Sequence, residues 1–236
     1  MLRNTLLQSL EWEDLRALHP FLGGVTLLDQ SVLHEIGRPF DGVYFIESGV
    51  VSLLSGTSRY MVQTAAISHK GVVGSTLVSG SDIAFHQATV LFSGSASRIT
   101  TSELLRFIAL GHPIEQILLS STMDLLARGC QTALCAVAHN AEQRIACWLL
   151  EAVDALDSAA LHMTHTRLAN LLGLRRAGLT EVLRRFESDG LIRKSRGHIF
   201  VRSSERLQSV ACDCYQRINW TPTIREYDQK SVLQCR

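Results

Sequence analysis

A set of side chains between residues 164 and 196 has the types and spacing needed to contact nucleic acid. Arginine can donate two parallel hydrogen bonds to guanine, and glutamate can accept one from cytosine. Arg176 and Glu181 are therefore the expected base readers. Backbone contacts are expected from Arg175, Thr180 and Arg184. The full candidate set is Thr164, Arg175, Arg176, Ala177, Thr180, Glu181, Arg184, Arg185, Lys194 and Arg196.

The residues around this set have the pattern of a helix-turn-helix. Thr164 is a credible N-cap of a first helix, and Ala169 is small where two helices would cross closely. Gly173 follows where the turn needs a left-handed residue, and Leu174 can fill the corner. Apolar residues then recur on one face of a second helix. Because these constraints are independent, they predict a DNA-binding motif over residues 163–185.

A short basic hairpin is expected directly after the second helix. Two apolar runs, at 191–193 and 198–201, flank Ser195-Arg-Gly197. We expect the hairpin tip to carry Lys194 and Arg196 and to hold phosphate. From Met163 to Arg206 the local charge is +6, within a chain of net charge +1. The alternative is a plain helical domain with a solvated basic surface.

Residues 112–138 predict one long helix with a narrow apolar seam. Its positions step by 4, 3, 4, 3 and 4 residues, the 3.5-residue period of a helix packed against its copy. The seam consists of Leu119, Met123, Leu126, Cys130, Ala133 and Val137. A second stripe, expected to face the preceding domain, consists of Leu118, Leu125 and Leu134. The alternative is a helix buried within one subunit.

Residues 21–100 alternate short apolar runs with glycine-rich separators, as in an antiparallel sandwich or barrel. The runs are 25–28, 31–34, 43–46, 50–54, 60–66 and 88–92, and the separators include Ser48-Gly49 and Gly94. Residues 1–20 have helical spacing that ends at Pro20. The expected fold class is α+β: a jelly-roll-like antiparallel β-roll, a dimerisation helix and a winged helix-turn-helix. The expected domains are 1–111, 112–138, 139–219 and a tail at 220–236.

This order of parts resembles the CRP/FNR family of bacterial transcription regulators over about residues 5–215. In the roll, the resemblance rests on residues 39–53 (PFDGVYFIESGVVSL), and in the DNA-binding part it rests on residues 168–173 and on Gly190-Leu-Ile. Two further segments, Arg175-Arg-Ala-Gly178 and Cys212-Asp-Cys-Tyr215, resemble a branch of the family whose effector is undefined. It implies a homodimer on two-fold symmetric DNA. In the best-studied members, the positions matching Ala177 and Glu181 hold Glu and Arg, so their target sequence is not expected here.

The effector site departs from family members that bind cyclic nucleotides. Those members use Gly-Glu-x-x-Gly and an Arg-Ser pair, whereas Val72 stands here in place of the glutamate. From Gly71 to Ser97 there is no lysine or arginine, and Arg98 lies outside the expected position. Because a buried phosphate needs a cation or a dense cradle of amides, we expect no ordinary cyclic AMP site. The candidate effector pocket is Gly71, Val72, Gly74 and Ser75.

Other chemistry receives weaker support. Cys212-x-Cys214 could bind metal with Cys235 and His198, but spacing alone favours ordinary thiols, so no metal and no cofactor is expected. No cysteine precedes Cys130, which argues against the family's N-terminal iron–sulfur cluster; a disulfide between two Cys130 residues is a minor alternative. Haem ligation by His69, His86 or His139 stays open, and no catalytic constellation suggests an enzyme.

The sequence thus predicts a DNA-binding transcription regulator. Its expected partners are double-stranded DNA, a second copy, an unidentified small-molecule effector and RNA polymerase. No stretch approaches the ~18 apolar residues of a membrane helix, and no secretory signal is evident, so the expected compartment is the cytoplasm. The alternative function is a small-molecule or redox sensor module that has lost DNA binding.

Overall fold

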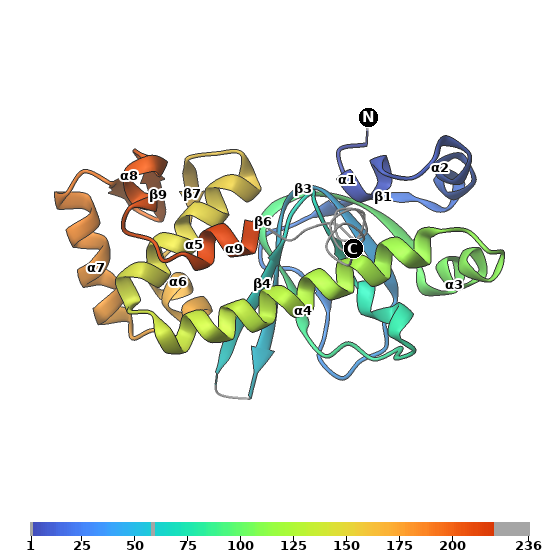
Figure 1. The fold of residues 1–236 in the computed structure, drawn as a ribbon, viewed down its shortest axis with the longest axis horizontal. Coiled ribbons are helices and arrows are strands. Elements are labelled where there is room, and N and C mark those ends of the chain that lie inside the picture. Colours follow the sequence, from blue (N-terminus) through green and yellow to red (C-terminus); the bar gives the residue numbers. More distant parts are fainter. Residues whose placement is uncertain (1, 58–59, 220–236) are drawn as a thin grey trace, which may run out of the picture.

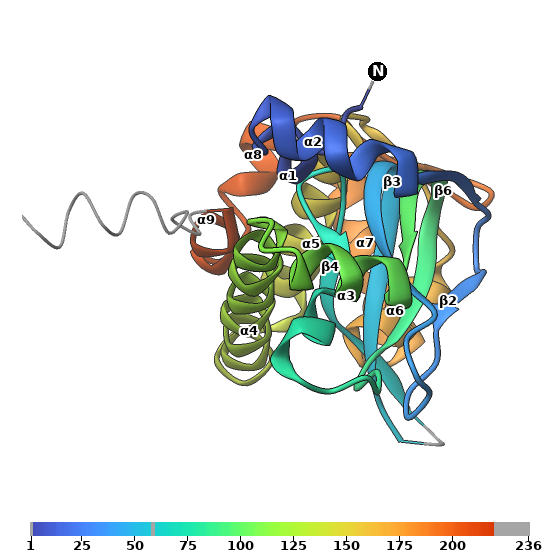
Figure 2. The same ribbon diagram turned by 90° about the vertical axis from the view of Figure 1, so that its right-hand side faces the viewer.

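The computed structural model describes residues 2–57 and 60–219. An antiparallel roll lies at one end, a winged helical domain lies at the other, and one long helix runs along both (Figure 1). Turning the molecule shows this helix, α4 (Ile114–Ala138), lying along one side of the roll rather than through it (Figure 2). The chain therefore has the α+β fold that its sequence predicts.

The roll is one sheet with strand order β1-β6-β3-β4. Two further strands join it: β2 pairs with β6, and β5 pairs with β3. All pairings are antiparallel. Helices α1 and α2 and the 3-10 turn η1 precede it, and Pro20 lies within η1. The bounds are α1 Thr5–Gln8, α2 Trp12–Leu18, η1 His19–Phe21, β1 Gly23–Leu27, β2 Val32–His34, β3 Gly42–Gly56, β4 Met61–Ile67, β5 Val72–Val73, η2 Ser75–Ser79 and β6 Gln87–Thr100.

Two of the glycine separators are not turns, which corrects the sequence analysis. Strand β3 continues through Gly49, and β6 continues through Gly94. A Cβ on Gly49 would lie 2.5 Å from the carbonyl oxygen of Phe92, and one on Gly94 would lie 2.0 Å from that of Ser48. The register shifts between Ile46 and Val50 at the same place. These glycines therefore permit a bulge where two backbones approach closely.

Helices α3 and α4 are separated at Gly111-His-Pro113, as the sequence predicts. Thr100 caps α3 (Thr101–Ala109) with a reciprocal bond to Glu103, which fixes where β6 ends and the helix begins. After α4, Asn140 caps α5 (Ala141–Leu156) in the same way with Gln143. Residues 139 and 140 form the hinge between these two helices.

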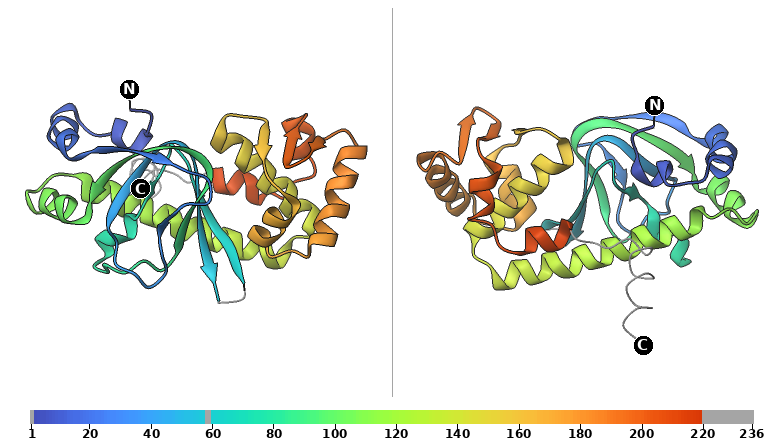
Figure 3. Two further views of the ribbon diagram at one scale, coloured as in Figure 1. Left: turned by 180° about the vertical axis from the view of Figure 1, so that it is seen from behind. Right: turned by 45° about the horizontal axis from the view of Figure 1, so that its top comes forward.

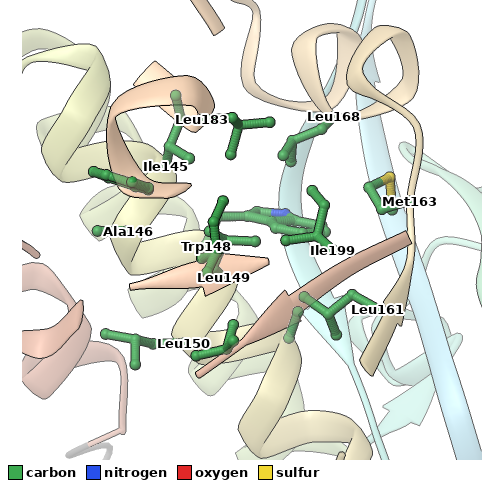
Figure 4. Packing of buried hydrophobic residues seen from close by; sticks show 14 of the residues in the cluster. Ile145, Ala146, Trp148, Leu149, Leu150, Leu161, Met163, Leu168, Leu183 and Ile199 are labelled. Atoms are coloured by element: carbon green, nitrogen blue, oxygen red, sulfur yellow. The ribbon is translucent and has the colours of Figure 1, made fainter. Parts of the chain in front are cut away.

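The C-terminal domain is built on α5 and a three-stranded sheet of order β7-β9-β8. Trp148 of α5 lies at the centre of its core, surrounded by Leu149, Leu168, Leu183 and Ile199 (Figure 4). The elements are β7 Ala160–His162, α6 His165–Leu172, α7 Arg176–Ser188, β8 Ile192–Ser195, β9 His198–Val201, α8 Ser204–Gln208 and α9 Cys214–Asn219. The same core includes roll residues, among them Val50 and Phe92, so the two parts pack directly together.

The division of the chain into domains at residues 111, 138 and 219 remains a prediction, and the tail 220–236 lies outside the described residues. Within the described ranges, none of the helices is long and apolar enough to cross a membrane.

Candidate nucleic-acid interface

The turn between α6 and α7 has the geometry that the sequence predicts. The Thr164 hydroxyl accepts a hydrogen bond from the backbone of Arg167 and caps α6. Gly173 ends α6 with φ of 62°, in the left-handed region, and the next N–H, that of Leu174, bonds the carbonyl of Ala169 at 2.9 Å. This sharp turn directs α7 across α6, as a helix-turn-helix requires.

Helix α7 buries one face and exposes the other. Leu179, Val182, Leu183 and Phe186 are buried in the domain core. On α7 and at its N-cap, the exposed residues of the candidate set are Arg175, Arg176, Ala177, Glu181, Arg184 and Arg185. Helix α7, which carries all of these residues except its N-cap Arg175, lies at the end of the molecule farthest from the roll (Figures 1 and 3).

Several of these side chains already have partners. Arg184 donates to Glu181 at 2.8 Å, and this bond holds the pKa of Glu181 below its usual value. Arg185 pairs with Glu142 of α5 at 2.9 Å. Among the described residues, Arg175 and Arg176 form no ion pair. They are therefore the arginines of α7 most available to a polyanion.

Thr180 is positioned by α6. Its hydroxyl lies 3.1 Å from Nδ1 of His165, and it is half-buried. Burial lowers the pKa of His165, and the nearby cations Lys194 and Arg176 lower it further, so this histidine stays neutral near pH 7. The contact couples the start of α6 to the middle of α7.

The hairpin that follows α7 differs from expectation at one residue. The turn is Arg196-Gly197, with Gly197 at φ of 75°, and Arg196 is exposed there. Lys194 lies in strand β8, not at the tip, and its ammonium pairs with Glu187 of α7 at 3.0 Å. Because strand alternation turns Lys194 toward α7, only Arg196 of the two is presented by the turn.

Arg167, which the sequence analysis counted only as part of the basic block, points away from this face. Its guanidinium binds both carboxylate oxygens of Asp29, at 2.8 and 3.1 Å, and also the backbone carbonyls of Val90 and Leu91. Nothing in the sequence connects positions 29 and 167. This arginine joins α6 to the roll instead of contacting a ligand.

The candidate seam residues on α4 are all exposed in the single chain. Leu119 is 42% exposed, Met123 and Leu126 are each 59% exposed, and Val137 is 89% exposed. Cys130 and Ala133 are exposed as well. The second stripe is only partly as expected: Leu118 is buried and Leu125 packs on the roll, but Leu134 is 53% exposed. Leu134 therefore belongs to the outward apolar surface.

The candidate effector residues do not line one common cavity. Gly71 and Val72 border a cavity of about 100 Å³ that also touches Ser121 and Asp124 of α4. Ser75 is buried, and within the described chain its hydroxyl has no hydrogen-bond partner. Gly74 adopts φ of 93° beside the ring of His34. Arg98 bonds the Asp41 carboxylate at 3.2 Å and Tyr44, so its charge is already matched.

The cysteines give an arrangement that spacing did not show. Cys135, His139, Cys212 and Cys214 lie together, whereas His198 lies beside His162 in the winged sheet, with 4.8 Å between the ring centroids. Cys235 lies outside the described residues. His198 as a partner of Cys212 and Cys214 was therefore wrong. The residues beside these two cysteines are Cys135 and His139, at the C-terminal end of α4.

Comparison with known proteins agrees with this architecture. Residues 143–210 match the model of the Crp-like helix-turn-helix domain. FixK2 from Bradyrhizobium japonicum has a similar structure, with a TM-score of 0.69 and 17% identity over 81% of this chain and 98% of that one. A CRP/FNR-family transcriptional regulator from Thermus thermophilus gives 0.65 and 20%, over 80% and 98%. The c-di-GMP responsive regulator CLP from Xanthomonas campestris gives 0.68 and 15%, over 82% and 100%. No curated protein matches the chain in sequence.

With its antiparallel roll, long helix and winged helix-turn-helix, this chain shares the fold of these solved structures, one of which is a transcriptional regulator of the CRP/FNR family. Its residues 143–210 are similar to the Crp-like helix-turn-helix domain.

Proposed function

We propose that this protein is a sequence-specific DNA-binding regulator that acts as a homodimer. The observation that carries the proposal is the exposed face of α7, where Arg175 and Arg176 have no acidic partner among the described residues. The N-terminal part of a recognition helix is the part that enters the major groove. Arg196 in the adjacent turn is placed to contact phosphate and fix the register of the protein on the duplex.

The exposed seam of α4 supports the homodimer. Leucine, methionine and valine side chains spaced at 3.5 residues are costly to leave in water, and a second copy of the same helix would cover them. A parallel pair would present two α7 helices to successive major grooves, about 34 Å apart. The matching DNA would then be two-fold symmetric.

The effector of this regulator is not a cyclic nucleotide in our proposal. Val72 is buried in β5, and the cavity beside Gly71 is about 100 Å³, below the roughly 300 Å³ of typical ligand pockets. Residues 71–97 supply no cation, and Arg98 is paired with Asp41. Calorimetry with cyclic AMP and cyclic GMP should show no binding; a micromolar dissociation constant would contradict this part of the proposal.

The DNA-binding function is tested with duplexes selected from a random library. Affinity measured by fluorescence anisotropy should fall about a thousandfold or more between about 50 and 200 mM salt, because phosphate contacts release counterions. Replacing both Arg175 and Arg176 by alanine should abolish the selected binding. Arg38→Ala is a matched control, since that arginine is exposed on the roll. If the wild type binds no DNA at low salt, a sensor module without DNA binding becomes the better interpretation.

A further inference from the structure

Four side chains with metal-binding atoms converge where α4 ends. Cys135 lies in the last turn of α4, and His139 is the C-cap residue, whose backbone N–H donates to the carbonyl of Cys135 at 3.2 Å. Cys212 lies just before α9 and Cys214 is the first residue of α9, the helix that lies alongside α4 (Figure 3). The three sulfur atoms and one ring nitrogen all lie within 4.8 Å of one another.

The spacing of these atoms fits one tetrahedral ion. The sulfurs of Cys135 and Cys212 are 3.6 Å apart, and the sulfur of Cys214 lies 3.4 Å from Nδ1 of His139. Bonds of ~2.3 Å to sulfur and ~2.0 Å to nitrogen in a tetrahedron place ligand atoms roughly 3.4–3.8 Å apart. Only small side-chain shifts would therefore be needed to close the set around an ion.

Polar groups surround the cluster in the positions that metal ligands need. The second ring nitrogen of His139, Nε2, lies 3.8 Å from the carboxylate of Asp213, the usual kind of partner that orients a ligating histidine. The side-chain amide of Gln131 donates to the sulfur of Cys214 at 3.0 Å. Such a donor stabilises a thiolate.

Simple packing of thiols does not account for this arrangement. A buried cysteine often acts only as a small apolar side chain. Apolar packing gives no reason for the His139 imidazole and the Gln131 amide both to contact the sulfur of Cys214. A disulfide between Cys135 and Cys212 would use two sulfurs and leave Cys214 and His139 without a role.

We propose that Cys135, His139, Cys212 and Cys214 form a Cys₃His site for Zn²⁺. Three thiolates with one imidazole in a tetrahedron are typical of zinc, and four protein ligands leave no open position, so the site is structural. The ion would fasten the start of α9 to the end of α4, next to the hinge at residues 139 and 140. It would thereby hold the DNA-binding domain against the long helix.

The test uses the full chain, purified in reductant. We expect about one Zn²⁺ per chain by elemental mass spectrometry, and Co²⁺ substitution should give the charge-transfer and ligand-field bands of a tetrahedral thiolate site. Cys135→Ser and Cys212→Ser should lose both signals. Cys130→Ser, on the same helix but outside the cluster, should keep them. Asp213→Asn should weaken Zn²⁺ binding about tenfold to a hundredfold.

A second measurement needs no variant. In the zinc-loaded wild type, Cys135, Cys212 and Cys214 should resist alkylation, and a chelator should expose them. The proposal is overturned if the reduced protein holds no zinc and shows no Co²⁺ bands, or if Cys135→Ser and Cys212→Ser keep full zinc content. Recovery of a Cys135–Cys212 disulfide without Co²⁺ bands would assign the cluster to thiol chemistry instead. None of these readouts involves DNA, so they are independent of the proposed function.

Discussion

Arg167 of the helix-turn-helix holds Asp29 of the roll through two hydrogen bonds, of 2.8 and 3.1 Å, although 138 residues separate them in the chain. Both side chains are more than two-thirds buried. The guanidinium also bonds the carbonyls of Val90 and Leu91, so one arginine fixes α6 to β6 and to the turn after β1. The position of the DNA-binding domain on the roll is therefore set in part by a charged pair.

We expect Arg167→Ala and Asp29→Ala to be non-additive in urea unfolding. A largely buried, bidentate, charge-assisted pair should give a coupling free energy of about 1–2 kcal/mol. The exposed pair Glu35 and Arg38, at 3.9 Å, is the control and should give less than about 0.5 kcal/mol. Simple additivity at Arg167 and Asp29 would show that the contact does not stabilise the packing of the two parts.

Arg176→Ala and Arg196→Ala should weaken DNA binding in different ways. Loss of a base reader should cost about 1–3 kcal/mol on the selected sequence and relax preference at one base pair. Loss of a phosphate contact in the hairpin turn should weaken binding to all sequences. It should also reduce the slope of the logarithm of the binding constant against the logarithm of salt concentration by about one. Anisotropy titrations at several salt concentrations on selected and scrambled duplexes separate the two. Equal effects on both duplexes from Arg176→Ala would refute its base-reading role.

Leu126→Glu should convert the homodimer to a monomer. Leu126 is 59% exposed on the single chain, so the substitution costs little in the monomer but places like charges opposite each other in the pair. Sedimentation velocity measures the change directly. Leu105→Glu is matched in chemistry and lies on α3, where Leu105 is 47% exposed, and it should leave the dimer intact. A wild type that sediments as a monomer at every concentration would contradict the proposed dimer along α4.

Glu151 should make stability fall as pH rises from about 4.5 to about 7. Burial raises the pKa of its carboxyl to about 7; the Cys147 thiol and Arg128 lower that pKa, and Asp154 raises it. Across this pH range the unfolded carboxyl loses its proton while the folded one keeps it, so deprotonation favours unfolding. The loss is at most about 3 kcal/mol, complete above the folded pKa.

Glu151→Gln removes the titration and provides the comparison. Urea unfolding of both proteins from pH 4 to 8 should show the variant gaining stability relative to the wild type as pH rises, and then no further change. Because all other carboxylates are shared, the difference between the two curves reports Glu151 alone. Parallel curves across the range would mean that its pKa is unshifted in the folded protein.

The sequence by itself determined the elements whose signals are local. Thr164 caps α6, Gly173 adopts the left-handed conformation of the turn, and Leu179 and Val182 are buried. All four residues lie within one continuous stretch of the chain. Their periodicity, capping and turn chemistry depend on neighbours a few residues away. The α+β class followed from the same kind of evidence.

Only the tertiary structure decided the relations between distant residues. Gly49 and Gly94 resembled turns, but each allows two long strands to approach, which depends on the partner backbone. The sequence placed Arg167 in the basic block expected to meet phosphate, but in the structure its guanidinium pairs with the carboxylate of Asp29. Cys135 and Cys212 are 77 residues apart in the chain and 3.6 Å apart at their sulfurs. Side-chain types and short spacings specify local conformation, whereas contacts across the fold arise only when burial of the common core brings separate elements together.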